Sequence, residues 1–108
     1  MLIAEIVQEI AELTVENRKG VEALFSAESH LADCEKALDT AEASAFLAGT
    51  GSVAERQARA KLECAEIRFE RDLAKAQVNR VRTKLRVIES ALMAQATMSK
   101  LMQAEMKL

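Results

Sequence analysis

A seven-residue repeat of apolar side chains runs through nearly all of this 108-residue chain, and it restricts the fold to long helices packed against partners. The first half carries two interleaved series, here called the first seam: Ile3, Ile10, Asn17, Leu24, Leu31, Leu38 and Ala45, with Ile6, Leu13, Gly20, Ala27, Cys34 and Ala41. After Gly51 comes the second seam: Val53, Ala60, Ile67, Ala74, Val81, Ile88 and Met102, with Cys64, Val78, Leu85 and Leu92. Such unbroken heptads are typical of helices wound around each other with a left-handed supercoil.

The composition agrees with an all-α protein. The chain has no proline, no Trp or Tyr, three glycines and three phenylalanines, which suits long helices and leaves few aromatic side chains for a globular core. A pair of helices of this length buries little apolar surface per residue, so we expect the chain to self-associate.

The glycines predict one helical-hairpin domain over residues 1–108. A first helix is expected at about 2–48, ended by Gly49, followed by a turn at 49–52 and a second helix at about 53–107. Ser52 and Glu55 form a capping box in which each side chain accepts from the other residue's amide. A turn this short favours antiparallel helices. If the turn centres on Gly49, facing residue numbers sum to about 98, which pairs Gly20 with Val78 and Cys34 with Cys64.

A second, weaker set of apolar residues lies outside the two seams. Its members are Val7, Val21, Phe25 and Ala32 in the first helix and Leu62, Phe69, Leu73 and Val87 in the second. Apolar positions beyond the seam widen the buried face of a helix, so we expect two hairpins to form a four-helix bundle or a higher oligomer.

Charge is divided unevenly between the two helices. Residues 1–48 hold ten acidic and three basic side chains, whereas residues 52–108 hold seven acidic and twelve basic ones. Five bases without an acid lie between Asp72 and Glu89: Lys75, Arg80, Arg82, Lys84 and Arg86. They have two interpretations, a nucleic-acid-binding stretch or pairing with the acidic first helix, such as Glu16 with Arg82 and Glu12 with Arg86. We favour pairing, because no aromatic residues for base stacking are interleaved.

The last thirteen residues extend beyond the predicted pairing, which ends near Gln95. Alone, this tail (96–108) would expose Met98, Leu101, Met102 and Met106 to water. It has two interpretations, a helix that binds another protein through adaptable thioethers or a continuation of the oligomer core.

Polar seam residues have structural interpretations. Asn17 either fixes the register of the helices or is a half-solvated side chain. Cys34 and Cys64 are expected to be packed thiols of a reducing compartment rather than a metal or redox pair, since His30 is the only histidine and zinc usually takes four ligands.

No catalytic constellation, phosphate-binding glycine loop or metal motif is present in the sequence. We therefore expect no enzymatic activity, no cofactor and no metal. No apolar run reaches the ~20 residues of a membrane span, and the first residues do not have the pattern of a signal peptide, so we expect a cytoplasmic protein without membrane partners.

One segment carries a family resemblance. Residues 43–66, with an Ala-rich helix end, a Gly-containing turn and Glu-Arg-x-Ala-x-Ala opening the next helix, resemble small helical-hairpin proteins encoded by tailed bacteriophages. The Arg-rich stretch and the Met-Gln-Ala-Glu-Met tail are also similar. The resemblance implies an accessory role in phage recombination or replication, or the modulation of a host protein, and it brings no catalytic residues.

Overall fold

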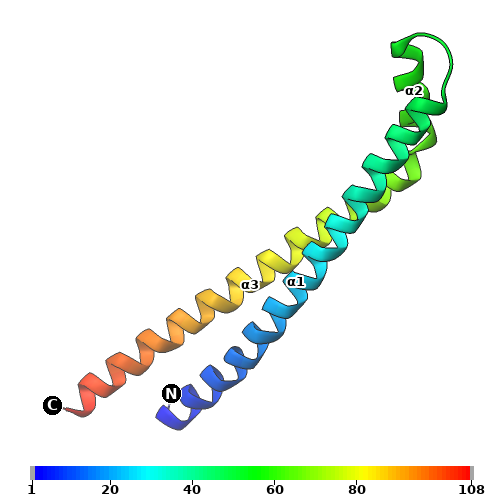
Figure 1. Cartoon of the computed structure of the whole chain (residues 1–108). Coiled ribbons are helices and arrows are strands. Elements are labelled where there is room, and N and C mark those ends of the chain that lie inside the picture. The colour runs from blue at the N-terminus through cyan, green and yellow to red at the C-terminus, as the bar shows by residue number, and fades with distance from the viewer. Residues whose placement is uncertain (1, 108) are drawn as a thin grey trace. The chain divides into compact units, whose positions relative to one another are not determined.

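The chain is all helical over residues 2–107, which are the residues that this computed structural model describes. It contains α1 (Ile3–Ala48), α2 (Val53–Glu63) and α3 (Ala65–Met106), and no strand occurs in that part of the chain (Figure 1). The all-α prediction is confirmed. The predicted second helix, however, is divided into α2 and α3 at Cys64.

The division at Cys64 is a local irregularity in the helical backbone. Cys64 has φ −97° and ψ 13°, and its N–H donates to the carbonyls of both Ala60 and Leu62. Carbonyl groups in the last turn of a helix lack helical partners. The carbonyl of Lys61 in that turn accepts instead from Nη1 of Arg68, at 3.1 Å. Arg68 therefore ties the end of α2 to the start of α3.

The turn between α1 and α2 differs in detail from the predicted one. Gly49 donates to the carbonyl of Phe46 at 3.3 Å, but the residue with positive φ is Gly51, at +99°. A side chain at Gly51 would be strained by this φ and would meet the carboxylate of Glu55. Ser52 is the N-cap of α2 as predicted, since its Oγ accepts from the amide of Glu55 at 3.2 Å. The Glu55 carboxylate lies over Gly51 and no return bond to the Ser52 amide is formed among residues 2–107, so only half of the capping box is confirmed.

The helices divide into two compact units. The terminal unit consists of residues 2–24 and 80–107, and the turn unit of residues 25–79. In the terminal unit the buried side chains are Ile6, Leu85 and Ile88. In the turn unit they are Leu38, Ala60, Cys64, Ala74 and Val78. All eight belong to the predicted seams, so the heptad prediction of the core is confirmed at these positions.

Contacts between α1 and α3 in the terminal unit fix their register. Leu85 packs so closely on Gly20 that a Cβ added to the glycine would lie 2.5 Å from Cδ2 of Leu85. Nearer the ends, Nε2 of Gln95 donates to Oε2 of Glu9 at 2.8 Å. The facing numbers thus sum to about 105 rather than 98, and the predicted pairing of Gly20 with Val78 is wrong.

The error in register is one heptad, and the longer turn accounts for about half of it. The prediction centred the turn on Gly49, whereas Thr50, Gly51 and Ser52 also lie outside the helices, which moves the midpoint toward the C-terminus. Because the shift is a whole heptad, the same seam positions are buried in either register. The predicted ion pairs do change: within residues 2–107, neither Glu12 nor Glu16 forms a salt bridge.

Candidate functional site

The C-terminal end of α3 exposes large apolar side chains. Met98, Leu101 and Met106 are 38%, 62% and 72% exposed. Met102 is half-buried, and so is Ser99, which occupies the preceding core position of the heptad repeat. Burial along the second seam therefore continues past Gln95, the residue at which the predicted pairing ends. Of the predicted partner-binding residues, three are therefore available at the surface and Met102 is partly taken up by the seam. Leu108 lies outside the described residues.

The basic stretch does not form one continuous row. Lys75 belongs to the turn unit, and Arg80, Arg82, Lys84 and Arg86 belong to the terminal unit, where all four are exposed. Successive residues of a helix are about 100° apart around its axis, which places Arg80 and Lys84 on one flank of α3 and Arg82 and Arg86 on the other.

These bases are less neutralised than predicted. Over residues 2–107, Arg80, Lys84 and Arg86 take part in no salt bridge. Glu12, the predicted partner of Arg86, instead accepts from the side-chain amide of Gln8 at 3.1 Å. The preferred interpretation, in which the acidic first helix pairs with this stretch, is wrong for these three side chains.

Asn17 lies half-buried in the first seam, and its Oδ1 has no hydrogen-bond partner in the described chain. Oε1 of Gln95, which occupies a heptad core position of α3, also has no hydrogen-bond partner. An unpaired buried polar atom costs about 1–3 kcal/mol, so these two amides reduce the stability of the terminal unit. The half-solvated and register-fixing interpretations of Asn17 both remain predictions.

The two cysteines do not face each other. Cys34 Sγ lies 3.7 Å from Nε2 of His30, one helical turn away. The groove that Cys34 and His30 line is completed by side chains of α3 between Glu70 and Gln77, well past Cys64. Cys64 is buried at the junction of α2 and α3, and both thiols are free. The predicted pairing of Cys34 with Cys64 is wrong because the register differs by one heptad.

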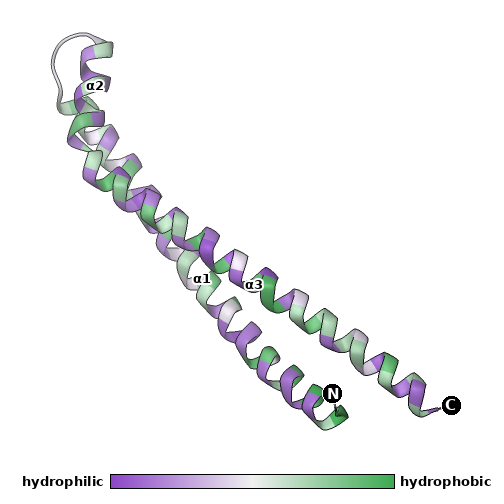
Figure 2. Ribbon diagram, turned by 180° about the vertical axis from the view of Figure 1, so that it is seen from behind, coloured by the Kyte–Doolittle hydropathy of each residue, from purple (hydrophilic) through white to green (hydrophobic). Residues whose placement is uncertain are grey.

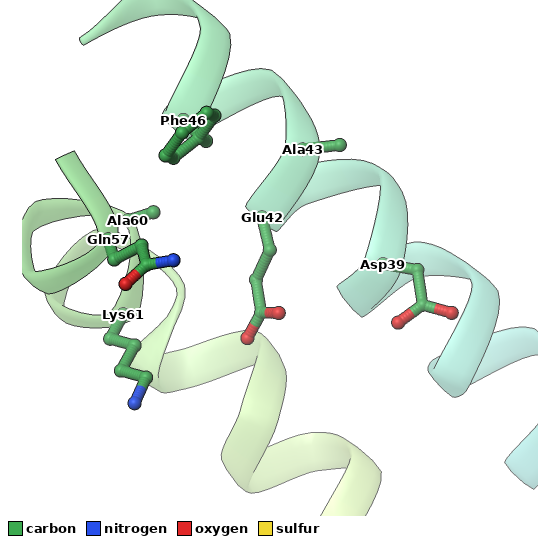
Figure 3. Close-up of a pocket in the computed structure, with 7 residues that line it drawn as sticks. All are labelled: Asp39, Glu42, Ala43, Phe46, Gln57, Ala60 and Lys61. Atoms are coloured by element: carbon green, nitrogen blue, oxygen red, sulfur yellow. The ribbon is translucent and has the colours of Figure 1, made fainter. Parts of the chain in front are cut away.

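Near the turn, polar side chains of the turn unit are mutually satisfied. Arg56 stacks on Phe46, with its guanidinium carbon 4.4 Å from the ring centre, while its Nε donates to the Phe46 carbonyl at 3.0 Å. Arg68 pairs with Glu42. Figure 3 shows Phe46 facing Ala60 across an open groove of about 480 Å³. These contacts hold α1 against α2 and the start of α3, and we assign them a structural role.

One further pair lies within α3. Arg71, a charged residue in the second seam, forms a salt bridge through Nε to Asp72 at 2.8 Å. The Arg71 side chain as a whole is 29% exposed. We assign Arg71 a structural role on the basis of this salt bridge.

An exposed apolar surface of the turn unit lies on α2 and α3. Leu62, Phe69 and Leu73, predicted as part of the second apolar set, are 80%, 58% and 55% exposed. Figure 2 shows hydrophobic and hydrophilic residues alternating along all three helices. This surface has no partner within the turn unit that buries it.

Among residues 2–107, no three His, Cys, Asp or Glu side chains come close enough together to bind a metal ion. No helix in the same range is long and apolar enough to cross a membrane.

Comparisons with known proteins give no further assignment. No protein family, no curated protein and no solved structure matches the chain.

Proposed function

We propose that this chain is a non-enzymatic interaction or adaptor protein, an antiparallel helical hairpin that self-associates and binds a further protein through the end of α3. The resemblance of residues 43–66 to phage helical-hairpin proteins extends the proposal. It suggests an accessory role in phage recombination or replication, or the modulation of a host protein, in the cytoplasm of the host.

The antiparallel arrangement is supported by contacts within each unit. In the terminal unit, Glu9 pairs with Gln95, and Gly20, farther along α1, meets Leu85, farther back along α3. In the turn unit, Glu42 pairs with Arg68, and Phe46 meets Arg56. As residue numbers rise along α1, the numbers of their partners fall.

The binding role rests on one observation, the exposure of Met98, Leu101 and Met106 near the end of α3. Large apolar side chains in water favour association, and methionine adapts to partner surfaces of different shapes. In the same helix, Met93 is equally exposed but lies before the tail, which provides a matched control.

The test compares proteins that the immobilised chain retains from a bacterial lysate. We expect a partner that binds the wild type and the Met93→Gln variant but not the Leu101→Gln/Met106→Gln variant. Glutamine keeps helix propensity while removing the apolar surface, so far-UV circular dichroism should be unchanged in both variants. Retention of the same proteins by all three forms would refute a binding role for the tail.

A second candidate function is nucleic-acid binding, favoured by the unpaired charges of Arg80, Lys84 and Arg86. Affinity for single- and double-stranded DNA would be measured over a range of salt concentrations. If Arg80 and Lys84 contact phosphates, their replacement by Gln should lower the salt dependence by about one unit per lost contact, whereas Lys100→Gln should not. The absence of binding at low salt would remove this candidate.

A further inference from the structure

The turn unit carries a second row of apolar residues on α2 and α3, on the face away from the first helix. The row is Ala58, Leu62, Ala65, Phe69, Leu73 and Ala76, spaced three or four residues apart, and we name it the outer row. All six are exposed. At about 100° per residue, the outer row lies almost diametrically opposite the seam residues Cys64, Ile67 and Arg71. Residues 58–76 of α2 and α3 thus have two apolar faces, of which α1 covers one.

The large side chains of the outer row are available for association. Leu62, Phe69 and Leu73 are 80%, 58% and 55% exposed, and no element of the turn unit buries them. Burial of such side chains against an apolar surface favours association.

Charges beside the outer row determine how a second copy can approach. On one flank lie Lys61, Asp72 and Lys75, and on the other lie Arg59, Glu66 and Glu70, all of them exposed, so the first flank has a net positive charge and the second a net negative charge. Pairing two copies head to tail would place each flank against its own kind, lysine beside lysine and glutamate beside glutamate. Pairing them in parallel places the lysine flank of each copy beside the glutamate flank of the other, which is the complementary arrangement.

We propose that the outer row is the self-association surface, and that it packs against the outer row of a second copy with the two helices parallel. This inference rests on the self-association that we propose above and names its surface and direction. Phe69 of one copy then packs against Phe69 of the other, with Leu62 against Leu62 one heptad before. The two α3 helices form the centre of the dimer, and each α1 lies outside.

The first experiment measures dimer affinity by sedimentation. Replacing Leu62 and Phe69 by Gln should weaken the dimer by at least about 30-fold, the effect of losing one strong interface residue. The matched control, Phe25→Gln/Leu47→Gln, removes equally exposed apolar side chains of the same unit from α1 and should leave the affinity within about threefold, as expected away from such residues. Far-UV circular dichroism should be alike in all three proteins, because each substituted side chain is exposed.

The outcomes separate this inference from the broader proposal. A wild-type chain that stays monomeric at micromolar concentration would overturn both. A dimer that the Leu62→Gln/Phe69→Gln variant retains would overturn the outer row but not self-association.

The second experiment tests direction by disulfide formation in a Cys34→Ser/Cys64→Ala background. Residues 58 and 76 are about 27 Å apart along the helix. In a parallel dimer, Ala58→Cys and Ala76→Cys should each form disulfide-linked dimers alone, and mixing the two should give no crosslink between them. Crosslinks only in the mixture would show a head-to-tail dimer and overturn the parallel pairing.

Discussion

The contact between Gly20 and Leu85 makes a quantitative prediction about Gly20→Ala. Alanine is about 1 kcal/mol more favourable than glycine in the interior of a helix. The added Cβ, however, would stand 2.5 Å from Cδ2 and 3.1 Å from Cγ of Leu85, which is buried. Overpacking of this kind costs about 1–3 kcal/mol. We therefore expect Gly20→Ala to leave the free energy of unfolding unchanged or to lower it by up to about 2 kcal/mol.

A double-mutant cycle isolates the contact. Leu85→Ala alone should cost about 2–5 kcal/mol because it empties a buried site. In that background the clash is absent, so Gly20→Ala should stabilise the chain by about 1 kcal/mol. The coupling energy is then about 1–3 kcal/mol. It is measured by urea unfolding followed by circular dichroism, at one fixed chain concentration because self-association adds to the apparent stability.

Val78→Ala provides the control, since the register with facing numbers summing to 98 would pair Gly20 with Val78. We expect Gly20→Ala to couple with Leu85→Ala and to be additive with Val78→Ala. Coupling to Val78 alone would show that the observed register is wrong. Stabilisation of the otherwise wild-type chain by the full 1 kcal/mol or so of helix propensity would refute the close approach itself.

Three further predictions follow from the terminal unit, the cysteines and the turn. Asn17→Leu should raise the free energy of unfolding by about 1–3 kcal/mol in a urea titration, because it removes a buried oxygen without a partner; a loss of stability would show that Asn17 is hydrogen-bonded in solution. Mild oxidation should not join Cys34 to Cys64 within one chain, so a non-reducing gel after trypsin digestion should show no such crosslinked peptide. Ser52→Ala should cost about 1 kcal/mol through loss of the cap of α2, while Ser52→Asp should retain most of the stability; equal losses in both would exclude a capping role.

The heptad pattern was sufficient to include all eight buried residues, although its seam members Ile3 and Val53 are 36% and 60% exposed, and the turn chemistry was sufficient to place Ser52. Both signals are local or strictly periodic, so they can be identified in one sequence. The break at Cys64 had no such signal, because residues 62–65 contain neither glycine nor proline and have ordinary helix formers on both sides. It is recognisable only from the backbone of Cys64 and from the Arg68 side chain that donates to Lys61.

The unpaired bases show a second limit of sequence reasoning. The predicted ion pairs were correct in charge and in heptad position but depended on a register that periodicity does not determine. When one helix shifts by seven residues against the other, apolar seam positions still face apolar seam positions. Each charged side chain, however, then faces a different residue of the partner helix. Electrostatic predictions for a repeating sequence are therefore less secure than predictions of its core.

The register of α1 against α3 must therefore be selected by residues that interrupt the apolar heptad repeat. In the terminal unit these are Gly20, which makes room for Leu85, and Gln95, which donates to Glu9. A slip of one heptad would move Gln95 about 10 Å along the helix from Glu9 and would place Leu85 beside a residue with a side chain of its own. Gly20 and Gln95 each weaken the chain locally, through low helix propensity and through an unpaired amide oxygen respectively. Their cost is offset by specificity, because the purely apolar positions of the seam cannot distinguish between registers that differ by seven residues.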